Sequence, residues 1–205
     1  MTYIIAVTGP IGGGKSSLTH EIARALGNSS VVQFDDYEGL TSRPPEEILA
    51  WLEGGADVEA FSFPLLKQHL ERLKNGQSII EPRHGTTIEA RDYVVFETPF
   101  GRSHPDMAPF IDLQLWIEIP LDLALSRKVK QIVEYFIEVG RDDVHSQQLA
   151  WLRGFLEGYE SMVSKMLRLQ KKMLKPDSDV LINGLRNLDS TVPAAVEAIR
   201  KRFRA

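Results

Sequence analysis

The sequence predicts an α/β fold in which a parallel sheet carries helices on both faces. Short apolar segments rich in β-branched and aromatic residues alternate along the chain with amphipathic helical patterns. These segments are apolar almost throughout, as strands buried on both faces are, rather than at every second position. The chain has 205 residues, of which 43% are hydrophobic and 25% charged, so we expect one domain, residues 1–205, with a small helical lid.

The apolar segments place the strands at residues 3–8, 31–34, 78–80, 93–96, 113–119 and 180–182. Helical periodicity predicts helices near residues 18–26, 41–54, 64–75, 146–174 and 192–203. Gly27 after the first helix and Asn75 with Gly76 at the end of the third are typical helix stops. Two polar stretches, 81–91 and 98–109, are expected to be irregular.

The longest helical pattern carries an apolar seam with spacings of three and four residues. The seam consists of Leu149, Leu152, Leu156, Tyr159, Val163 and Met166. Such a seam fits a helix packed on its own domain, and it also fits the interface of a homodimer. Both interpretations stay open from the sequence.

The charge balance and the cysteine content exclude several classes of function. Lys and Arg number 24 against 28 Asp and Glu, a net charge of −4 that gives no electrostatic reason to expect nucleic acid or an anionic membrane as partner. The absence of cysteine excludes disulfides, thiol nucleophiles and cysteine-bound zinc. No apolar run is long enough for a membrane span or resembles a signal peptide, so we expect a cytoplasmic protein.

The segment directly behind the first predicted strand fits the phosphate-binding pattern G-x-x-x-x-G-K-[ST]. It runs through Gly9, Pro10, Ile11, Gly12, Gly13, Gly14, Lys15, Ser16 and Ser17. Small residues let successive backbone N–H groups point into one concavity, where they and the N-terminus of the next helix hold phosphate oxygens. Lys15 is expected to contact the β and γ phosphates, and the Ser16 hydroxyl to bind Mg²⁺. The pattern predicts a P-loop NTPase fold.

Acidic residues follow two of the predicted strands, at the sheet edge where open α/β folds bind ligands. Asp35 and Asp36 follow the second strand, and because neighbouring side chains alternate between faces, only one is expected to point into the site. A carboxylate that faces the γ-phosphate can accept the proton of an attacking hydroxyl and help to hold Mg²⁺. Glu97, after strand 93–96, is a second candidate for Mg²⁺ or for a substrate hydroxyl.

In these residues the chain resembles the uridine kinase and nicotinamide riboside kinase group, which belongs with phosphoribulokinase and bacterial pantothenate kinase among the P-loop kinases. Besides the phosphate loop, the resemblance is carried by residues 33–37, 94–97, 126–130, 140–142 and 178–183. It implies Mg²⁺-dependent transfer of the γ-phosphoryl group of ATP to a hydroxyl of a nucleoside-like small molecule. It also implies that Asp35 is the general base and Glu97 the second acid.

The family's lid corresponds to residues of about 127–145, where Arg127, Lys128, Lys130 and Arg141 lie. Cations that close over a transferring phosphoryl group stabilise its charge and exclude water. The predicted catalytic residues are therefore Lys15, Asp35, Arg127 and Lys130. ATP is expected to contact residues 9–17, Arg127, Arg141 and Asn183. The predicted metal ligands are Ser16, Asp35 and Glu97, and the predicted acceptor contacts are Asp35, Tyr37, Asp57, Arg83, His84, Glu97 and Arg102.

Two alternatives to a nucleoside kinase remain open. The same transfer can act on pantothenate, glycerate or a sugar phosphate, and the segment Thr98 to Arg102 departs from the family pattern; a sugar phosphate would need an extra anion site, for which Arg83 and Arg102 are candidates. The other alternative is a nucleotide-dependent switch without transfer. The guanine-binding pattern Asn-Lys-x-Asp is absent, and the presence of Asp35 favours transfer.

Two residue types receive a plainer interpretation. His84 has no second histidine or carboxylate at ligand spacing in the sequence, so a loop that offers polar contacts is favoured over a metal site. Trp51, Trp116 and Trp151 are interpreted as packing aromatics.

Overall fold

The computed structural model describes residues 2–37, 45–139 and 145–203. Its strands are β1 (Tyr3–Thr8), β2 (Ser29–Gln33), β3 (Ile79–Ile80), β4 (Thr87–Ile88), β5 (Tyr93–Glu97), β6 (Leu113–Glu118) and β7 (Val180–Asn183). Its α-helices are α1 (Lys15–Leu26), α2 (Pro45–Glu53), α3 (Pro64–Lys74), α4 (Leu121–Val139), α5 (His145–Gly158), α6 (Ser164–Leu174) and α7 (Leu188–Phe203). Short 3₁₀ turns cover Phe34–Tyr37, Val58–Ala60, Gly101–Ser103 and Ala108–Phe110, and a π-helical segment covers Tyr159–Val163.

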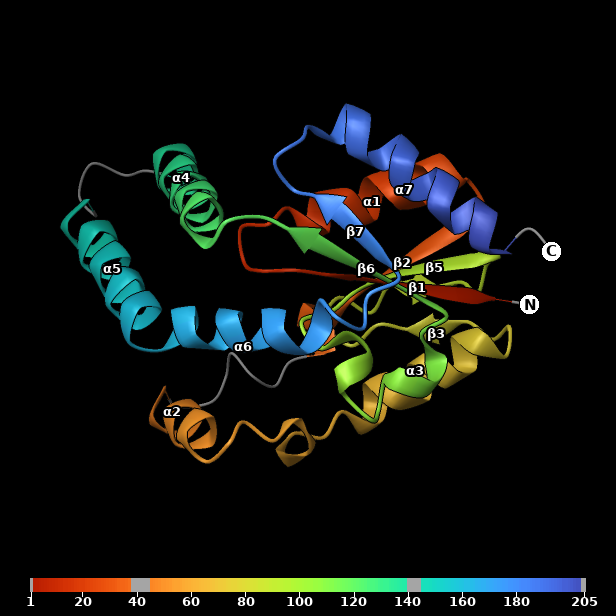
Figure 1. Ribbon diagram of the computed structural model, residues 1–205, viewed down its shortest axis with the longest axis horizontal. Helices are drawn as coiled ribbons and strands as arrows, with labels where there is room; N and C mark the ends of the chain where they lie inside the picture. The colour runs from red at the N-terminus through yellow and green to blue at the C-terminus, as the bar shows by residue number, and fades with distance from the viewer. Residues whose placement is uncertain (1, 38–44, 140–144, 204–205) are drawn as a thin grey trace.

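Five strands form one parallel sheet in the order β2-β5-β1-β6-β7. Figure 1 shows α1 and α7 on one face of this sheet and α3 and α6 on the other. The predicted α/β architecture is thereby confirmed. The carboxyl ends of β6 and β7 point toward α4 and α5, whereas both chain termini lie at the opposite end of the sheet.

The central strand β1 shows why its residues fold as a buried parallel strand. Ile4, Ile5, Ala6 and Val7 are fully buried. Ile4 and Ala6 belong to the core that includes α3, and Ile5 and Val7 to the core under α1 and α7. Because both faces of the strand are covered, an uninterrupted apolar run is required, and burial of each larger aliphatic side chain contributes about 1.5–3 kcal/mol.

The predicted strand at 78–80 does not join the main sheet. Ile79–Ile80 instead pairs antiparallel in a separate two-stranded hairpin with Thr87–Ile88, which lies in the stretch 81–91 that was expected to be irregular. Ile79 is buried but Ile80 is 63% exposed, so this short run covers the core with one face only. A run of two apolar residues cannot span a sheet that is buried on both sides.

The long helical pattern is helical throughout its length but is not one regular helix. A π segment, Tyr159–Val163, joins α5 to α6, and the two helices run in different directions (Figure 1). Since a π turn adds one residue to the helical repeat, the residues before and after it no longer share a face. Tyr159 is buried, whereas Leu149 is 67% exposed. Only the second half of the seam therefore packs on the chain's own core. A homodimer interface remains an open interpretation for the seam.

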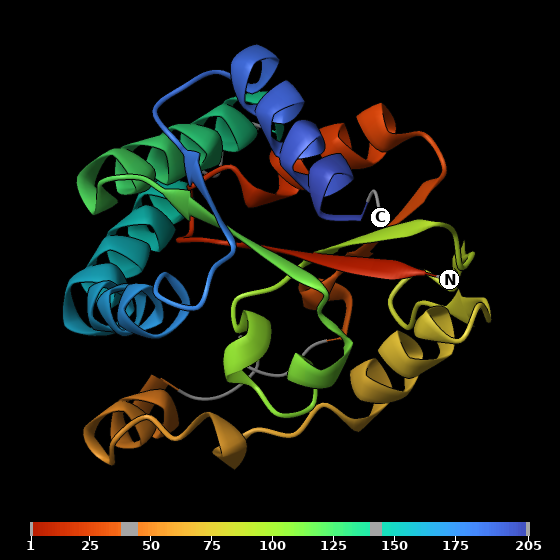
Figure 2. The same ribbon diagram turned by 45° about the vertical axis from the view of Figure 1, so that its right-hand side comes forward.

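The helices α4 and α5 lie side by side beyond the carboxyl end of the sheet (Figure 2). The Phe136 and Trp151 rings meet edge to face at 5.7 Å, and Gln148 Nε2 donates a hydrogen bond to the Phe136 carbonyl at 3.4 Å. Trp116 is buried, as a packing aromatic is expected to be, but Trp151 is exposed over about half of its surface.

Within the described residues, no helix has the length and apolar character needed to cross a membrane.

The last helix begins earlier than its apolar pattern predicts. Asn187 Oδ1 accepts a hydrogen bond from the Ser190 backbone N–H at 3.2 Å, which is the contact that an N-capping residue makes. The helix α7 therefore begins at Leu188, four residues before the start that was predicted at residue 192.

Candidate active site

The phosphate loop joins β1 to α1, and its glycines are required by geometry. Gly12 has a φ of +73°, and a Cβ atom placed there would lie 2.0 Å from the Ala124 carbonyl oxygen of α4. Gly14 precedes α1 with a φ of +86° and brings no capping side chain to the helix. The first N–H groups of α1 are thus left to bind an anion, which the helix dipole also favours.

Lys15 is the cation at the centre of this loop. Its Nζ donates a hydrogen bond to the Pro10 carbonyl at 3.2 Å. Burial lowers the pKa of Lys15, the carboxylates of Glu97 and Asp35 oppose that shift, and the Lys128 ammonium adds to it. The partly desolvated ammonium group is therefore attracted by two carboxylates and repelled by another cation.

Asp35 and Glu97 line the same cavity as Lys15, which has a volume of about 340 Å³. They come from the 3₁₀ turn after β2 and from the end of β5, two strands that are paired so that Gln33 lies beside Glu97. Burial raises the pKa of Glu97, although Lys15 and a hydrogen bond from the Ser16 hydroxyl act in the opposite direction. Two carboxylates, a lysine and a serine hydroxyl thus gather at the carboxyl edge of the sheet.

The neighbouring Asp36 has different surroundings. It lies next to the hairpin of β3 and β4, where its ligand atoms and those of Glu81 and His84 are within 4.8 Å of one another. Burial raises the pKa of Asp36, and the Glu81 carboxylate raises it further. The sequence showed no such group around His84, because the turn after β2 supplies a residue 48 positions away.

Glu81 already has partners in this hairpin. Its carboxylate accepts hydrogen bonds from the backbone N–H groups of Arg83 and His84 at 2.8 Å and of Thr86 at 3.2 Å. Burial alone would raise the pKa of Glu81, but these donors hold it below its usual value. Arg83 and His84 are exposed, and neither belongs to the described lining of the 340 Å³ cavity.

A second cavity of about 260 Å³ lies on the other side of the phosphate loop. Its wall combines loop residues with the segment after β7 and includes Gly13, Ser17, Arg127, Asn183, Gly184, Arg186 and Asn187. Arg127 Nη1 donates a hydrogen bond to the Gly184 carbonyl at 2.8 Å and so ties α4 to that segment. Both Arg127 and Asn183 were predicted to contact ATP, and the structure brings them together here.

The three other cations of the predicted lid differ in where they lie. Lys128 lies against the phosphate loop, since its Cβ is 3.2 Å from the position of a Cβ on Gly12. Lys130 forms an ion pair with Glu134 at 3.7 Å and is 76% exposed, so its charge faces solvent rather than the loop. Arg141 lies outside the described residues.

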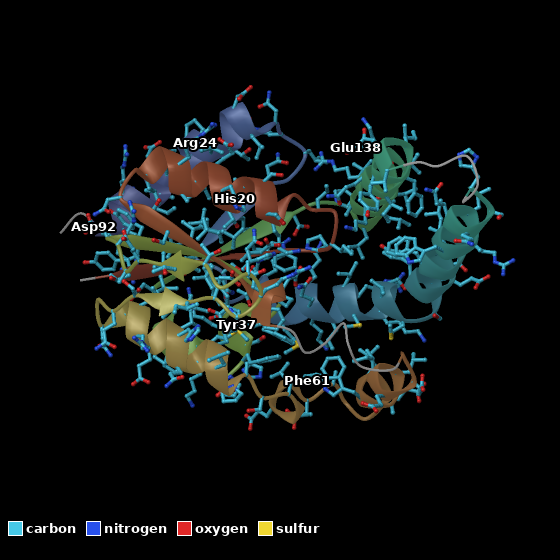
Figure 3. The ribbon with its side chains drawn as sticks, turned by 180° about the vertical axis from the view of Figure 1, so that it is seen from behind. His20, Arg24, Tyr37, Phe61, Asp92 and Glu138 are labelled. Carbon is cyan, nitrogen blue, oxygen red and sulfur yellow. The ribbon has the colours of Figure 1, made fainter. Side chains whose placement is uncertain are left out.

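Three predicted acceptor contacts are held elsewhere. Tyr37 lies between the sheet and α3 (Figure 3), with its hydroxyl 2.9 Å from His69 Nδ1, and burial raises its pKa. Asp57 is exposed and accepts a hydrogen bond from the Glu59 N–H at 2.9 Å, which caps a 3₁₀ turn. Among the described residues that line the two cavities, neither Tyr37 nor Asp57 is present.

Arg102 is the third of these residues. Its guanidinium group forms a hydrogen-bonded ion pair with Asp179 and lies 3.5 Å from an Asp177 oxygen. It also lines neither cavity among the described residues. The sequence predicted that Arg102 contacts the acceptor; in the described residues its charge is paired instead with two carboxylates that lie just before β7.

The sequence analysis missed most of the wall of the larger cavity. That wall is apolar and draws on α6, on the segment after β5 and on Trp51 of α2, which was interpreted as a packing residue. On α6, Met166, Gln170 and Met173 recur at spacings of four and three, the pattern of one helix face. This signal was present in the sequence, but it continued a seam that was interpreted as packing or dimerisation.

Known proteins that are similar to this chain include uridine kinases. No family model matches the chain. A uridine kinase from Halobacterium salinarum is 26% identical over 196 residues, which cover 88% of this chain and 80% of the relative. A uridine kinase from Staphylococcus aureus is 28% identical over 171 residues, which cover 74% of this chain and 78% of that protein.

The solved structures contain the same fold. A structure described as a possible uridine kinase from Bacillus stearothermophilus superimposes with a TM-score of 0.53, at 12% sequence identity and with 88% of each chain covered. The phosphate loop, the parallel sheet and these relatives lead to one conclusion. The chain has the P-loop fold and is similar over most of its length to proteins named uridine kinase.

Proposed function

We propose that this kinase transfers the γ-phosphoryl group of ATP to a hydroxyl of a small molecule, with Asp35 as the general base. One observation carries the proposal: Asp35, Glu97 and Lys15 line a single cavity that opens directly at the phosphate loop. A hydroxyl held there lies between a carboxylate that can accept its proton and the loop that holds the phosphate.

Other residues of the chain support the transfer by charge. The N–H groups at the start of α1 and the Lys15 ammonium hold the phosphate oxygens. Lys128, beside the loop, offsets charge that develops on the transferring group. Arg127 holds the segment after β7 against α4, on the side where the second cavity offers a place for the rest of the nucleotide.

The donor groups at the site fit Mg²⁺. The Ser16 hydroxyl and the carboxylates of Asp35 and Glu97 are hard oxygen donors of the kind that Mg²⁺ prefers, and Ser16 already touches Glu97 through a hydrogen bond. When bound, the ion would offset the negative charge of the phosphates. Ser16, Glu97 and Asp35 are the residues that would hold it.

Two classes of acceptor compete. The names of the relatives support a nucleoside-like alcohol. The apolar wall of the cavity favours an uncharged alcohol of another class. A sugar phosphate has the weakest support, because the Arg102 guanidinium, one candidate for its anion site, is paired with Asp177 and Asp179.

Further expectations from the sequence remain predictions of the same proposal. They are that residues 1–205 form one kinase domain with a lid at about 127–145, that it acts in the cytoplasm without nucleic acid or a membrane as partner, and that the exposed part of the seam leaves a homodimer open.

The first experiment measures ADP release from Mg·ATP against a panel of nucleosides, pantothenate, glycerate, sugar phosphates and uncharged alcohols. The Lys15→Ala variant is the blank. An acceptor that raises ADP release well above the blank, with a phosphorylated product seen by mass spectrometry, supports transfer. Binding of ATP without any such acceptor would instead favour a nucleotide-dependent switch.

A further inference from the structure

The 3₁₀ turn after β2 carries Asp35 to the cavity, and each side of this turn faces a different part of the molecule. A 3₁₀ helix has three residues per turn, so residues three positions apart project to the same side. Phe34 and Tyr37, the first and last residues of the turn, therefore share one side, and both pack on the core that includes α3. Asp35 faces the cavity at the phosphate loop, and Asp36 faces the hairpin of β3 and β4.

The start of the turn is held by ring packing. The buried Phe34 ring meets the Phe63 ring edge to face at 4.9 Å and the Phe100 ring at 5.6 Å. Packing of this kind holds the turn against the core. A hydrogen bond adds a directional constraint, because its strength depends on the angle between donor and acceptor.

The end of the turn has such a hydrogen bond. The Tyr37 hydroxyl lies 2.9 Å from Nδ1 of His69 on α3, and the two rings meet edge to face at 5.5 Å. His69 is buried, and this burial lowers its pKa, to which the Arg72 guanidinium adds. The imidazole is therefore neutral near pH 7, so that one of its nitrogens can accept the hydrogen bond that the Tyr37 hydroxyl donates.

We propose that Tyr37 is a positioning residue for the general base: its hydrogen bond to His69 fixes the rotation of the 3₁₀ turn and thereby the direction of the Asp35 carboxylate. Tyr37 and Asp35 are two residues apart in one turn, so a rotation that moves one side chain also moves the other. This role differs from the acceptor contact that the sequence predicted for Tyr37. The inference rests on the phosphoryl transfer and on the role of Asp35 proposed above.

The geometry of a general base has a direct effect on rate. The carboxylate must lie within hydrogen-bond reach of the hydroxyl whose proton it accepts. A displacement of about 1 Å can slow a reaction by about 10²-fold even when its cause lies away from the reacting atoms. Loss of the Tyr37 hydroxyl should therefore change the rate of transfer more than it changes the binding of either substrate.

The first test is Tyr37→Phe, which removes only the hydroxyl group, in single-turnover transfer from Mg·ATP. The probe acceptor is uridine, or the compound of the first panel with the highest rate if uridine gives none. Rates are divided by the concentration of ATP-binding sites, so that any unfolded protein does not count. We expect transfer to be about tenfold slower, with the ATP dissociation constant and the acceptor KM within about twofold of the parent values.

Tyr159→Phe is the matched control. It also removes a hydroxyl that donates a hydrogen bond to another element, in this case to the Leu121 carbonyl at 3.4 Å. Tyr159 is absent from the described lining of both cavities. This variant should keep the rate of transfer within about twofold of the parent rate, because its hydrogen bond does not hold the turn that carries Asp35.

A double-mutant cycle with Asp35→Asn assigns the effect to the base. If Tyr37 acts through Asp35, Tyr37→Phe should slow the residual transfer of the Asp35→Asn enzyme by less than about twofold. A general disturbance of the structure would instead slow transfer by the same factor in both backgrounds. This comparison therefore separates a positioning role from a merely structural one.

Two substitutions test the partner on α3. His69→Leu removes the acceptor and should reproduce the tenfold loss, and the double variant Tyr37→Phe/His69→Leu should be no slower than either single variant. Asn carries an oxygen on Cγ where histidine carries Nδ1, so His69→Asn keeps an acceptor in that place and should restore most of the rate.

Each contrary result has a distinct meaning. A parent-like rate of Tyr37→Phe, an equal loss in the parent and Asp35→Asn backgrounds, or equal losses in His69→Asn and His69→Leu would overturn the inference. A higher acceptor KM of Tyr37→Phe with an unchanged rate would also overturn it and support an acceptor contact instead. All of these results leave the phosphoryl transfer standing. If no acceptor of the panel raised ADP release above the Lys15→Ala blank, the phosphoryl transfer itself would fail, and this inference with it.

Discussion

Gly12 of the phosphate loop packs against the Ala124 carbonyl of α4 so closely that a single added carbon would lie 2.0 Å from the carbonyl oxygen. The loop and the helix that carries the lid cations therefore fit together only while residue 12 has no side chain. This contact couples the position of α4 to the shape of the anion site, and it leads to the first prediction.

Gly12→Ala should lower the free energy of unfolding by about 2–4 kcal/mol, because it adds both a close contact and backbone strain at positive φ. It should also weaken ATP binding, since α4 or the loop has to move. Gly154→Ala is the control: no atom lies within 4 Å of the added carbon, and the substitution in α5 should stabilise the protein by about 0.5–1 kcal/mol. Denaturant unfolding and ATP titration measure both effects. Equal stability of the two variants would contradict the close contact.

Lys128 and Lys130 should differ sharply in their effect on turnover. Lys128→Met removes the cation beside the phosphate loop and should lower kcat by about 10²-fold. Lys130→Met removes only an exposed ion pair with Glu134 and should leave kcat within about twofold. Initial rates with saturating ATP compare them. A larger loss of kcat in Lys130→Met than in Lys128→Met would support the catalytic role of Lys130 that the family resemblance implied.

Asp35 and its neighbour Asp36 allow a test of the proposed base with a control one residue away. Asp35→Asn should keep ATP affinity and lose about 10²- to 10⁴-fold in kcat, because it cannot accept the acceptor's proton. Asp36→Asn should have a much smaller effect, since Asp36 faces Glu81 and His84. Single-turnover rates and ATP titration separate the two functions. Parent-like turnover of Asp35→Asn would move the base to Asp36 or Glu97.

The value of kcat/KM should fall at both low and high pH. The pH range of high activity should be narrower than an ordinary glutamate and an ordinary lysine would give. Burial raises the pKa of Glu97, so this acid takes up a proton, and would lose its affinity for Mg²⁺, at a higher pH than an ordinary glutamate. Burial lowers the pKa of Lys15, so its ammonium loses its charge at a lower pH than an ordinary lysine. Lys15→Arg should move the alkaline limb upward, because guanidinium keeps its proton.

The acid limb has its own control. Glu97→Gln should remove it and lower activity at neutral pH, because the amide cannot ionise. A profile of this variant that still falls on the acid side at the parent's pH would assign that limb to another group.

The part of the site that could be predicted depends on residues close together in the sequence. Strand β1, the phosphate loop and Lys15 form one continuous signal, because the loop must follow a buried strand and open a helix. Asp35 and Glu97 could be predicted because parallel strands end at the same edge of the sheet.

The remainder depends on contacts that the sequence does not display. Arg102 pairs with Asp179, which is 77 positions away, so its distance from the cavity was not visible from its own segment. The acceptor wall on α6 was hidden because the π segment shifts the helical repeat, so that Leu149 and Met166 belong to different surfaces although their spacing suggests one seam.

The two cavities share no lining residue among those that the structure describes, and residues of the phosphate loop border both of them. With ATP and the acceptor in these two cavities as proposed, both substrates can be present at the same time. Direct transfer then passes through a ternary complex: double-reciprocal plots at several fixed acceptor concentrations should intersect, and no phosphoenzyme should accumulate when ATP is added alone.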